Sequence, residues 1–109
     1  MRGRPKKYRI VRFNPRISQF SPRGKPGRPD QVELTMEEFE ALRLTDFLGL
    51  SQKESAKSMQ ISQPTFSRVL KRARKALAKG VVTGAAIKIQ GGHYVISSRE
   101  DSTRDTQNG

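Results

Sequence analysis

The sequence predicts a mainly α-helical fold, with a helix-turn-helix three-helix core, an extended basic N-terminal arm and a small C-terminal β-hairpin. Three segments each begin with a helix-capping signal and continue with apolar residues at helical spacing. Before them, a segment rich in arginine holds five of the six prolines. After them, apolar residues alternate along the chain. We expect the arm over residues 1–31, one folded domain over 32–96 and a disordered polar tail over 97–109.

The arm has a composition in which neither a helical nor a strand period persists. We therefore expect it to be extended and partly disordered. Within it, Phe13-x-Pro15 and Phe20-x-Pro22 repeat at a seven-residue spacing. The two aromatic side chains either dock on the folded domain and fix the path of the arm, or belong to a solvated arm. The sequence leaves both alternatives open.

The first predicted helix covers residues 36–48. Thr35-Met36-Glu37-Glu38 forms a capping box, and Gly49 is a natural stop. The acidic residues of its first turns lie where the helix dipole favours negative charge, and that role is sufficient to explain them. The residues expected to form its apolar stripe are Phe39, Ala41, Leu42, Leu44, Phe47 and Leu48.

The second and third helices follow closely. A capping box at Ser51-Gln52-Lys53-Glu54 starts a short helix that ends near Met59. The third helix starts at Ser62 and continues through Gly80 to a stop near Gly84. The residues expected to form its buried stripe are Phe66, Val69, Leu70, Ala73 and Leu77.

The segment after the third helix changes from helical to alternating spacing. Ile87 and Ile89 precede Gly91-Gly92, and Tyr94 and Ile96 follow it. Because a Gly-Gly pair suits a two-residue turn, these residues predict a β-hairpin. His93 has no neighbouring residues at metal-ligand spacing, so we expect it on the surface or partly packed.

The charge of the chain favours a nucleic-acid partner. The formal net charge is +12, and it divides into +9 over residues 1–30, −4 over 31–50 and +7 over 51–79. This much positive charge repels itself in a compact chain unless an anionic partner or solvent salt offsets it, and nucleic acid is the commonest such partner. A membrane surface is disfavoured because the basic segments contain no Trp, and no apolar segment is long enough to span a bilayer. We therefore expect a cytoplasmic, nucleoid-associated protein that does not bind membranes.

The residues between the second and third helices indicate a helix-turn-helix. This motif needs a small residue in its first helix and apolar residues on both sides of the turn, and they stand here as Ala56, Met59, Ile61, Phe66 and Val69. Gln60 occupies the turn position where glycine is usual. If its φ is positive, the backbone there is strained. No nucleophile–base pair or metal-ligand cluster can be assembled, so we expect no enzymatic activity, metal or cofactor.

Two resemblances support this interpretation. The run from Ser51 through Leu77, with Ser62-x-x-Thr65-Phe66-Ser67-Arg68-Val69-Leu70 at its centre, resembles the promoter-reading helix-turn-helix of sigma factors. The chain also resembles a prokaryotic family of predicted DNA-binding proteins, domain of unknown function number 134. The shared segments are Arg4–Lys7, Phe13–Gly24, Val32–Thr35, Glu40–Leu44 and Ile89–Gly92. Family members often carry cysteines in the arm; this chain has none, so no metal site carries over.

The helix-turn-helix interpretation assigns roles to individual residues. The third helix would enter the major groove with its N-terminus first. The residues expected to meet base edges are Gln63, Thr65, Ser67 and Arg68. The residues expected to hold phosphates are Ser51, Gln52, Lys71, Arg72, Arg74 and Lys75. A separate basic motif, Arg2-Gly3-Arg4-Pro5, is similar to an AT-hook and suits an A·T-rich minor groove.

The sequence therefore predicts a double-stranded DNA-binding protein that regulates transcription. The main alternative is an RNA-binding or ribosome-associated basic protein, which should carry exposed aromatic residues for stacking. A further alternative is an adaptor that contacts RNA polymerase through the acidic helix 36–48. A folded domain of this size gains stability from a docked arm or from homodimerisation, and both stay open.

Overall fold

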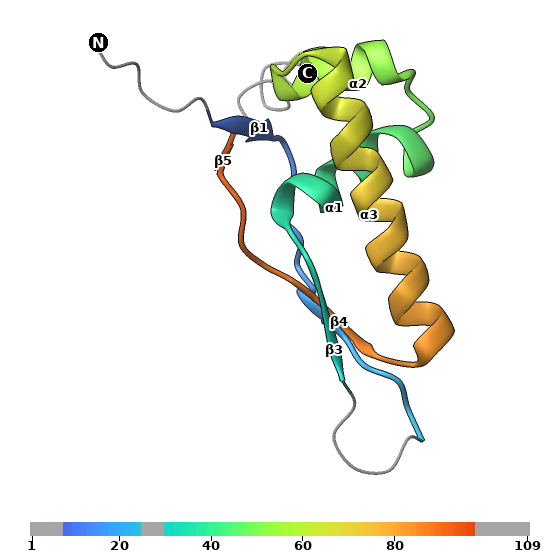
Figure 1. Ribbon diagram of the computed structural model, residues 1–109. Helices are drawn as coiled ribbons and strands as arrows, with labels where there is room; N and C mark the ends of the chain where they lie inside the picture. The colour runs from blue at the N-terminus through green and yellow to red at the C-terminus, as the bar shows by residue number, and fades with distance from the viewer. Residues whose placement is uncertain (1–7, 25–29, 98–109) are drawn as a thin grey trace, which may run out of the picture.

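The computed structural model describes residues 8–24 and 30–97, and within these ranges the chain is a compact, α-rich fold with small sheets (Figure 1). Its helices are α1 (Met36–Leu42), α2 (Gln52–Met59) and α3 (Gln63–Thr83). Helix α1 continues directly into a π-helical turn, η1 (Arg43–Phe47). Its strands are β1 (Arg9–Val11), β2 (Gln19–Phe20), β3 (Gln31–Leu34), β4 (Ala86–Ile89) and β5 (Tyr94–Ile96). None of these helices is long and apolar enough to cross a membrane.

The predicted helix starts are confirmed. Thr35 caps α1: its hydroxyl accepts from the Glu38 N–H at 3.1 Å, and its own N–H donates to the Glu38 carboxylate at 2.9 Å. Ser51 caps α2 in the same reciprocal way, and Ser62 caps α3. Gly84 ends α3 in the left-handed conformation, with φ of 72°.

The predicted helix over residues 36–48 is confirmed in its extent, but its second half is a π-helical turn and not a regular α-helix. After Leu42 the backbone widens into the π turn, and the Leu48 N–H donates to the Arg43 carbonyl at 2.8 Å. The wider turn changes the direction of the following side chains. Leu44 stays in the core, but Phe47 is 81% exposed and Leu48 is also exposed.

The predicted C-terminal hairpin does not form. β4 lies at the centre of a three-stranded sheet, antiparallel to β2 and parallel to β3. Because both edges of β4 are occupied, β5 pairs with another partner, β1, in a parallel arrangement. Residues 8–24 of the arm therefore supply two strands, which the sequence analysis did not predict.

The described part of the arm docks on the folded domain. Val11 of β1 is fully buried, and the Phe13 ring stacks on Phe39 of α1 with centroids 6.1 Å apart. The backbone N–H of Arg12 donates to the Glu40 carboxylate at 3.0 Å. Of the two alternatives for the aromatic residues of the arm, docking is confirmed for Phe13.

Apolar side chains pack in two clusters, and Leu42 of α1 packs against both. One cluster joins α1, α2 and α3, and its buried members are Ala41, Leu44, Ala56, Met59, Phe66, Val69 and Leu70. The other joins α1 and α3 to the strands through Val11, Leu34, Met36, Ala73, Ile87 and Ile89. Leu77, expected in the buried stripe of α3, is 39% exposed because it lies at the edge of a groove described below.

Candidate nucleic-acid interface

The candidate interface begins at the turn that joins α2 to α3. The Ile61 N–H donates to the Ala56 carbonyl at 3.0 Å, and the Gln60 N–H donates to the Lys57 carbonyl at 3.1 Å. These two hydrogen bonds form a Schellman motif, in which the residue just after the helix, here Gln60, adopts the left-handed conformation. Gln60 accordingly has φ of 58° and ψ of 46°. The turn from Gln60 to Ser62 is short, so α3 starts directly beside the end of α2.

The inner faces of α2 and α3 hold these helices in place. Ala56 and Met59 of α2 are buried, and so are Phe66 and Val69 of α3. Ile61 packs against the same cluster from the turn. The small side chain of Ala56 allows close approach of the helices, and the apolar contacts on both sides of the turn fix their angle.

The outward face of α3 carries a row of basic side chains. Arg68, Lys71, Lys75 and Lys79 are all exposed, and their spacing of three and four residues aligns them on one face. No carboxylate of residues 8–24 or 30–97 forms an ion pair with any of the four. We call these four residues the basic row. Uncompensated positive charge on a rigid helix is the arrangement that attracts a polyanion.

The first turn of α3 carries the predicted base-reading residues. Gln63 and Ser67 are exposed. Thr65 is half-buried, and its hydroxyl oxygen accepts from the Ser62 hydroxyl at 2.9 Å and from the Arg68 guanidinium at 3.3 Å. The hydroxyl of Thr65 is therefore engaged in capping α3 and in orienting Arg68 toward the start of the helix.

Arg74 lies apart from the basic row. Its guanidinium donates to both carboxylate oxygens of Asp46, at 2.8 and 3.1 Å. This hydrogen bond holds the pKa of Asp46 below its usual value and raises the pKa of Arg74. Arg72 is a looser case, because its Nε lies 3.9 Å from the Glu38 carboxylate and its side chain stays largely exposed.

The start of α2 offers less to a phosphate than the sequence predicts. The backbone N–H of Ser51 donates to the Glu54 carboxylate at 3.0 Å. The hydrogen bond with the Ser51 backbone, and then that with the Ser51 side chain, hold the pKa of Glu54 below its usual value. A negative charge therefore already occupies this end of the helix. Gln52 is half-buried beside it.

The predicted minor-groove residues Arg2, Gly3, Arg4 and Pro5 lie outside the described residues. The chain that follows them lies against α2. The Arg12 guanidinium donates to the Ser58 carbonyl at 3.1 Å and to the Ser58 hydroxyl at 3.3 Å. The arm therefore meets the folded domain beside the shorter helix of the α2–α3 pair.

Two buried carboxylates are structural residues that the sequence analysis missed. Glu40 is fully buried and accepts from Nε and Nη2 of Arg43 at 2.8 and 2.9 Å. Glu37 is buried, is ion-paired with Arg9, and accepts from the His93 N–H at 3.2 Å. Both precede Leu44 at helical spacing, so the period of α1 contained the signal for their burial.

His93 lies on the surface, one of the two placements that the sequence left open. His93 is exposed, and its ring stacks on Tyr8 with centroids 6.1 Å apart. Residues 8–24 and 30–97 contain no group of three or more His, Asp or Glu side chains arranged to hold a metal ion.

Comparison with known proteins gives a family match. Residues 1–97 match the family described as "Protein of unknown function DUF134". Over 95 residues the chain is 48% identical to a UPF0251 protein of Caldicellulosiruptor bescii, which covers 87% of this chain and 66% of that protein. A UPF0251 protein of Thermoanaerobacter sp. strain X514 is 45% identical over 98 residues, covering 89% of this chain and 87% of the relative.

A third relative, the UPF0251 protein of Thermoanaerobacter pseudethanolicus, is 47% identical over 92 residues, which cover 84% of this chain and 78% of the relative. The chain thus spans about two thirds of the length of the Caldicellulosiruptor protein and more of the other two. No solved structure matches the chain significantly.

Proposed function

The chain belongs to the DUF134 family, and we propose that it binds double-stranded DNA through a helix-turn-helix formed by α2 and α3 and regulates transcription. One observation carries this proposal. A short capped helix and a tight turn position α3 so that its inner face is buried and its outer face presents the basic row. The names of the relatives state no activity, so the argument rests on this geometry.

In the proposed complex, α3 enters the major groove with its N-terminus first. Gln63 and Arg68 then face base edges, where Gln pairs with adenine and Arg with guanine, each for about 1–3 kcal/mol of discrimination. Ser67 lies beside them on the exposed surface. Thr65 contributes by orienting Arg68 through the 3.3 Å hydrogen bond rather than by reading a base directly.

The rest of the basic row supplies phosphate contacts. Lys71 and Lys75 lie one and two turns beyond Arg68 and are exposed, so they can reach the phosphates of the DNA strands that border the major groove. Arg74 is held by Asp46 and would have to break that ion pair to bind a phosphate. The structure thus separates two neighbouring cations, Arg74 and Lys75, that sequence analysis placed in one group.

The alternatives from the sequence have less support. An RNA-binding surface would place exposed aromatic rings among the basic side chains. The most exposed ring, Phe47, lies instead in an apolar groove, away from the basic row. A polymerase contact through the acidic helix would need exposed carboxylates, but Glu37 and Glu40 are buried in ion pairs with arginines.

The test is the binding of duplex DNA as a function of salt. If the protein neutralises about six phosphates, log K should fall with log salt at a slope near −5. Arg68→Ala and Gln63→Ala should reduce the discrimination between a preferred and a scrambled site. Lys75→Ala should weaken both sites alike and flatten the slope by about one.

Arg74→Ala is the matched control, because it removes one positive charge from the adjacent position of the same helix. We expect it to change DNA binding less than Lys75→Ala, since Asp46 already neutralises Arg74. Equal losses on both sites for Arg68→Ala and Gln63→Ala would mean that the helix does not read bases. Salt-insensitive binding, or a strong preference for single-stranded RNA, would reject the proposal.

A further inference from the structure

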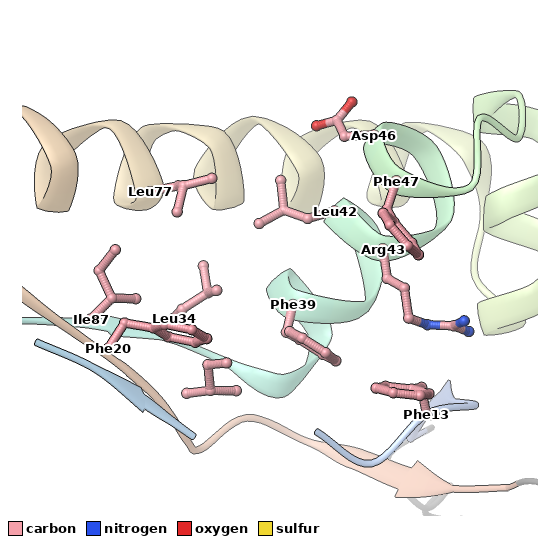
Figure 2. Close-up of a pocket in the computed structure, with 11 residues that line it drawn as sticks. Phe13, Phe20, Leu34, Phe39, Leu42, Arg43, Asp46, Phe47, Leu77 and Ile87 are labelled. Atoms are coloured by element: carbon pink, nitrogen blue, oxygen red, sulfur yellow. The ribbon is translucent and has the colours of Figure 1, made fainter. Parts of the chain in front are cut away.

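The described residues form an apolar groove between the arm, α1 with its π turn, α3 and β4 (Figure 2). Its volume is about 680 Å³. The walls are formed chiefly by Phe13, Phe20, Phe39, Phe47, Leu77 and Ile87, and Figure 2 shows these side chains around one open space.

The polar groups in this groove have partners. The Arg43 guanidinium is bound to Glu40 and lies 5.2 Å from the centroid of the Phe13 ring. The Asp46 carboxylate is bound to Arg74. The groove therefore carries no net charge, although the chain carries +12. It suits an apolar surface better than a charged or strongly polar ligand.

The rim of the groove exposes a large apolar area. Phe47 is 81% exposed, Phe20 53% and Phe13 44%. Leu77, which lines the same groove from α3, is 39% exposed. Taking ~200 Å² for a complete aromatic side chain, the three rings and Leu77 together expose on the order of 400 Å², within the range of the largest patches found on monomeric proteins.

We propose that this groove binds the same groove of a second copy, so that the chain forms a symmetric homodimer with Phe47 of each copy seated in the groove of the other. In a twofold symmetric interface, both partners use the same surface patch, so this patch must be complementary to itself. It therefore needs a protruding side chain next to a cavity that can receive the same side chain of the partner. Phe47 and the groove meet this requirement. These apolar side chains alone supply ~800 Å² over the two copies, most of the ~1,000 Å² expected of a specific interface.

The remaining segments of this sequence do not suit the groove. Residues 1–7, 25–29 and 98–109 contain no aromatic or aliphatic side chain except Met1 and prolines. A second copy, in contrast, brings an identical neutral and apolar surface. Two chains of charge +12 repel each other, so they can meet most easily at a surface that carries no net charge.

The position of the groove also leaves α3 available for another partner. Leu77 follows Arg68 by nine residues, which is about 180° around an α-helix. The groove and the basic row therefore lie on opposite faces of α3. Dimerisation through the groove does not cover the basic row, and it does not depend on the proposed DNA binding.

The experiment is sedimentation velocity over a range of protein concentrations at low and high salt, without DNA. We expect the parent chain to dimerise, and to dimerise more strongly at high salt because salt screens the repulsion between copies. Phe47→Asp should weaken the dimer at least ~100-fold, since the change removes an aromatic anchor and adds a charge in both copies. Circular dichroism should be unchanged because Phe47 is mostly exposed.

Val82→Asp is the matched control. Val82 is 82% exposed, does not line the groove, and lies about 140° around α3 from Leu77. The substitution Val82→Asp makes the same apolar-to-acidic change outside the groove. This variant should therefore dimerise at least as well as the parent chain. Dissociation of both variants to the same extent would overturn the proposal. So would a monomeric parent chain, and if that monomer enhances Nile red fluorescence, the groove takes a small apolar ligand instead.

Discussion

At the scale of single residues, Gln60 determines how α3 leaves α2. It is the one non-glycine residue with positive φ within residues 8–24 and 30–97. The left-handed conformation costs an L-residue ~1–2 kcal/mol, and glycine avoids this cost. The structure tolerates it because the Schellman hydrogen bonds and the packing of Ile61 both require this backbone conformation.

Substitution of Gln60 tests whether this turn is strained. Gln60→Gly should raise the free energy of unfolding by ~0.5–1 kcal/mol, because relief of strain exceeds the larger entropy that glycine loses on folding. Gln60→Val should lower it, since a β-branched residue fits the left-handed region poorly. Urea denaturation followed by circular dichroism measures both. A less stable Gln60→Gly would show that the glutamine side chain makes a stabilising contact.

Glu40 shows where residue-level prediction from the sequence fails. Its charge and its place in the first turns of a helix are explained by the helix dipole alone, so its burial was not predicted. The structure buries it completely and gives it the Arg43 guanidinium and the Arg12 backbone as donors. Its helical spacing from Leu44 was visible, but its partner Arg12 is distant in the sequence.

At the scale of elements, the close contact between α3 and β4 depends on Gly80. A methyl group added there would lie 2.5 Å from Cγ1 and 2.7 Å from Cδ1 of Ile87. From the sequence, we predicted only that the third helix continues through Gly80. The structure gives its reason: the helix backbone approaches the side of the sheet too closely for a larger residue.

Gly80→Ala therefore sets two effects of opposite sign against each other. Alanine favours the helix by ~1 kcal/mol, whereas overpacking against Ile87 costs ~1–3 kcal/mol. We expect a net loss in the free energy of unfolding, measured by urea denaturation. Ile87→Val, which shortens the opposing side chain, should make Gly80→Ala less harmful in the double variant. If Gly80→Ala alone is stabilising, the contact between α3 and β4 is looser than the structure shows.

The elements that the sequence predicted well are those specified locally. Caps at Thr35, Ser51 and Ser62 and the stop at Gly84 depend on a few adjacent residues, and the structure has all of them. The strands are two to four residues long and pair across the chain, as β1 does with β5. Such short segments carry no period of their own, so their pairing could not be predicted from local patterns.

At the scale of the whole molecule, the surfaces divide by chemistry along α3. The basic row occupies its outer face, and the apolar groove occupies the other side with Phe47 and Leu77. The candidate base-reading residues were predictable because they follow from the position of Ser62 and helical periodicity. The groove was not, because it depends on the π turn that exposes Phe47 and on the docking of Phe13.

The basic arm is the remaining part of the proposed DNA contact. Strand β1 starts at Arg9, and Arg12 is bonded to Ser58 of α2, so the described part of the arm begins beside the α2–α3 pair. A segment of seven residues can span at most ~25 Å when it is fully extended. Arg2, Gly3, Arg4 and Pro5 have the charge and the narrow shape that a narrow A·T-rich groove favours.

Deletion of residues 1–7 and the variant Arg4→Lys distinguish shape from charge, since Arg4→Lys keeps the charge. Affinity should be measured on sites flanked by A·T-rich and by G·C-rich DNA. An arm that reads the minor groove predicts that both variants lose affinity, mainly on the A·T-rich flank, where the groove is narrow and its potential more negative. A purely electrostatic tether predicts that Arg4→Lys binds like the parent chain and that the flank makes no difference, because attraction then depends only on the number of charges.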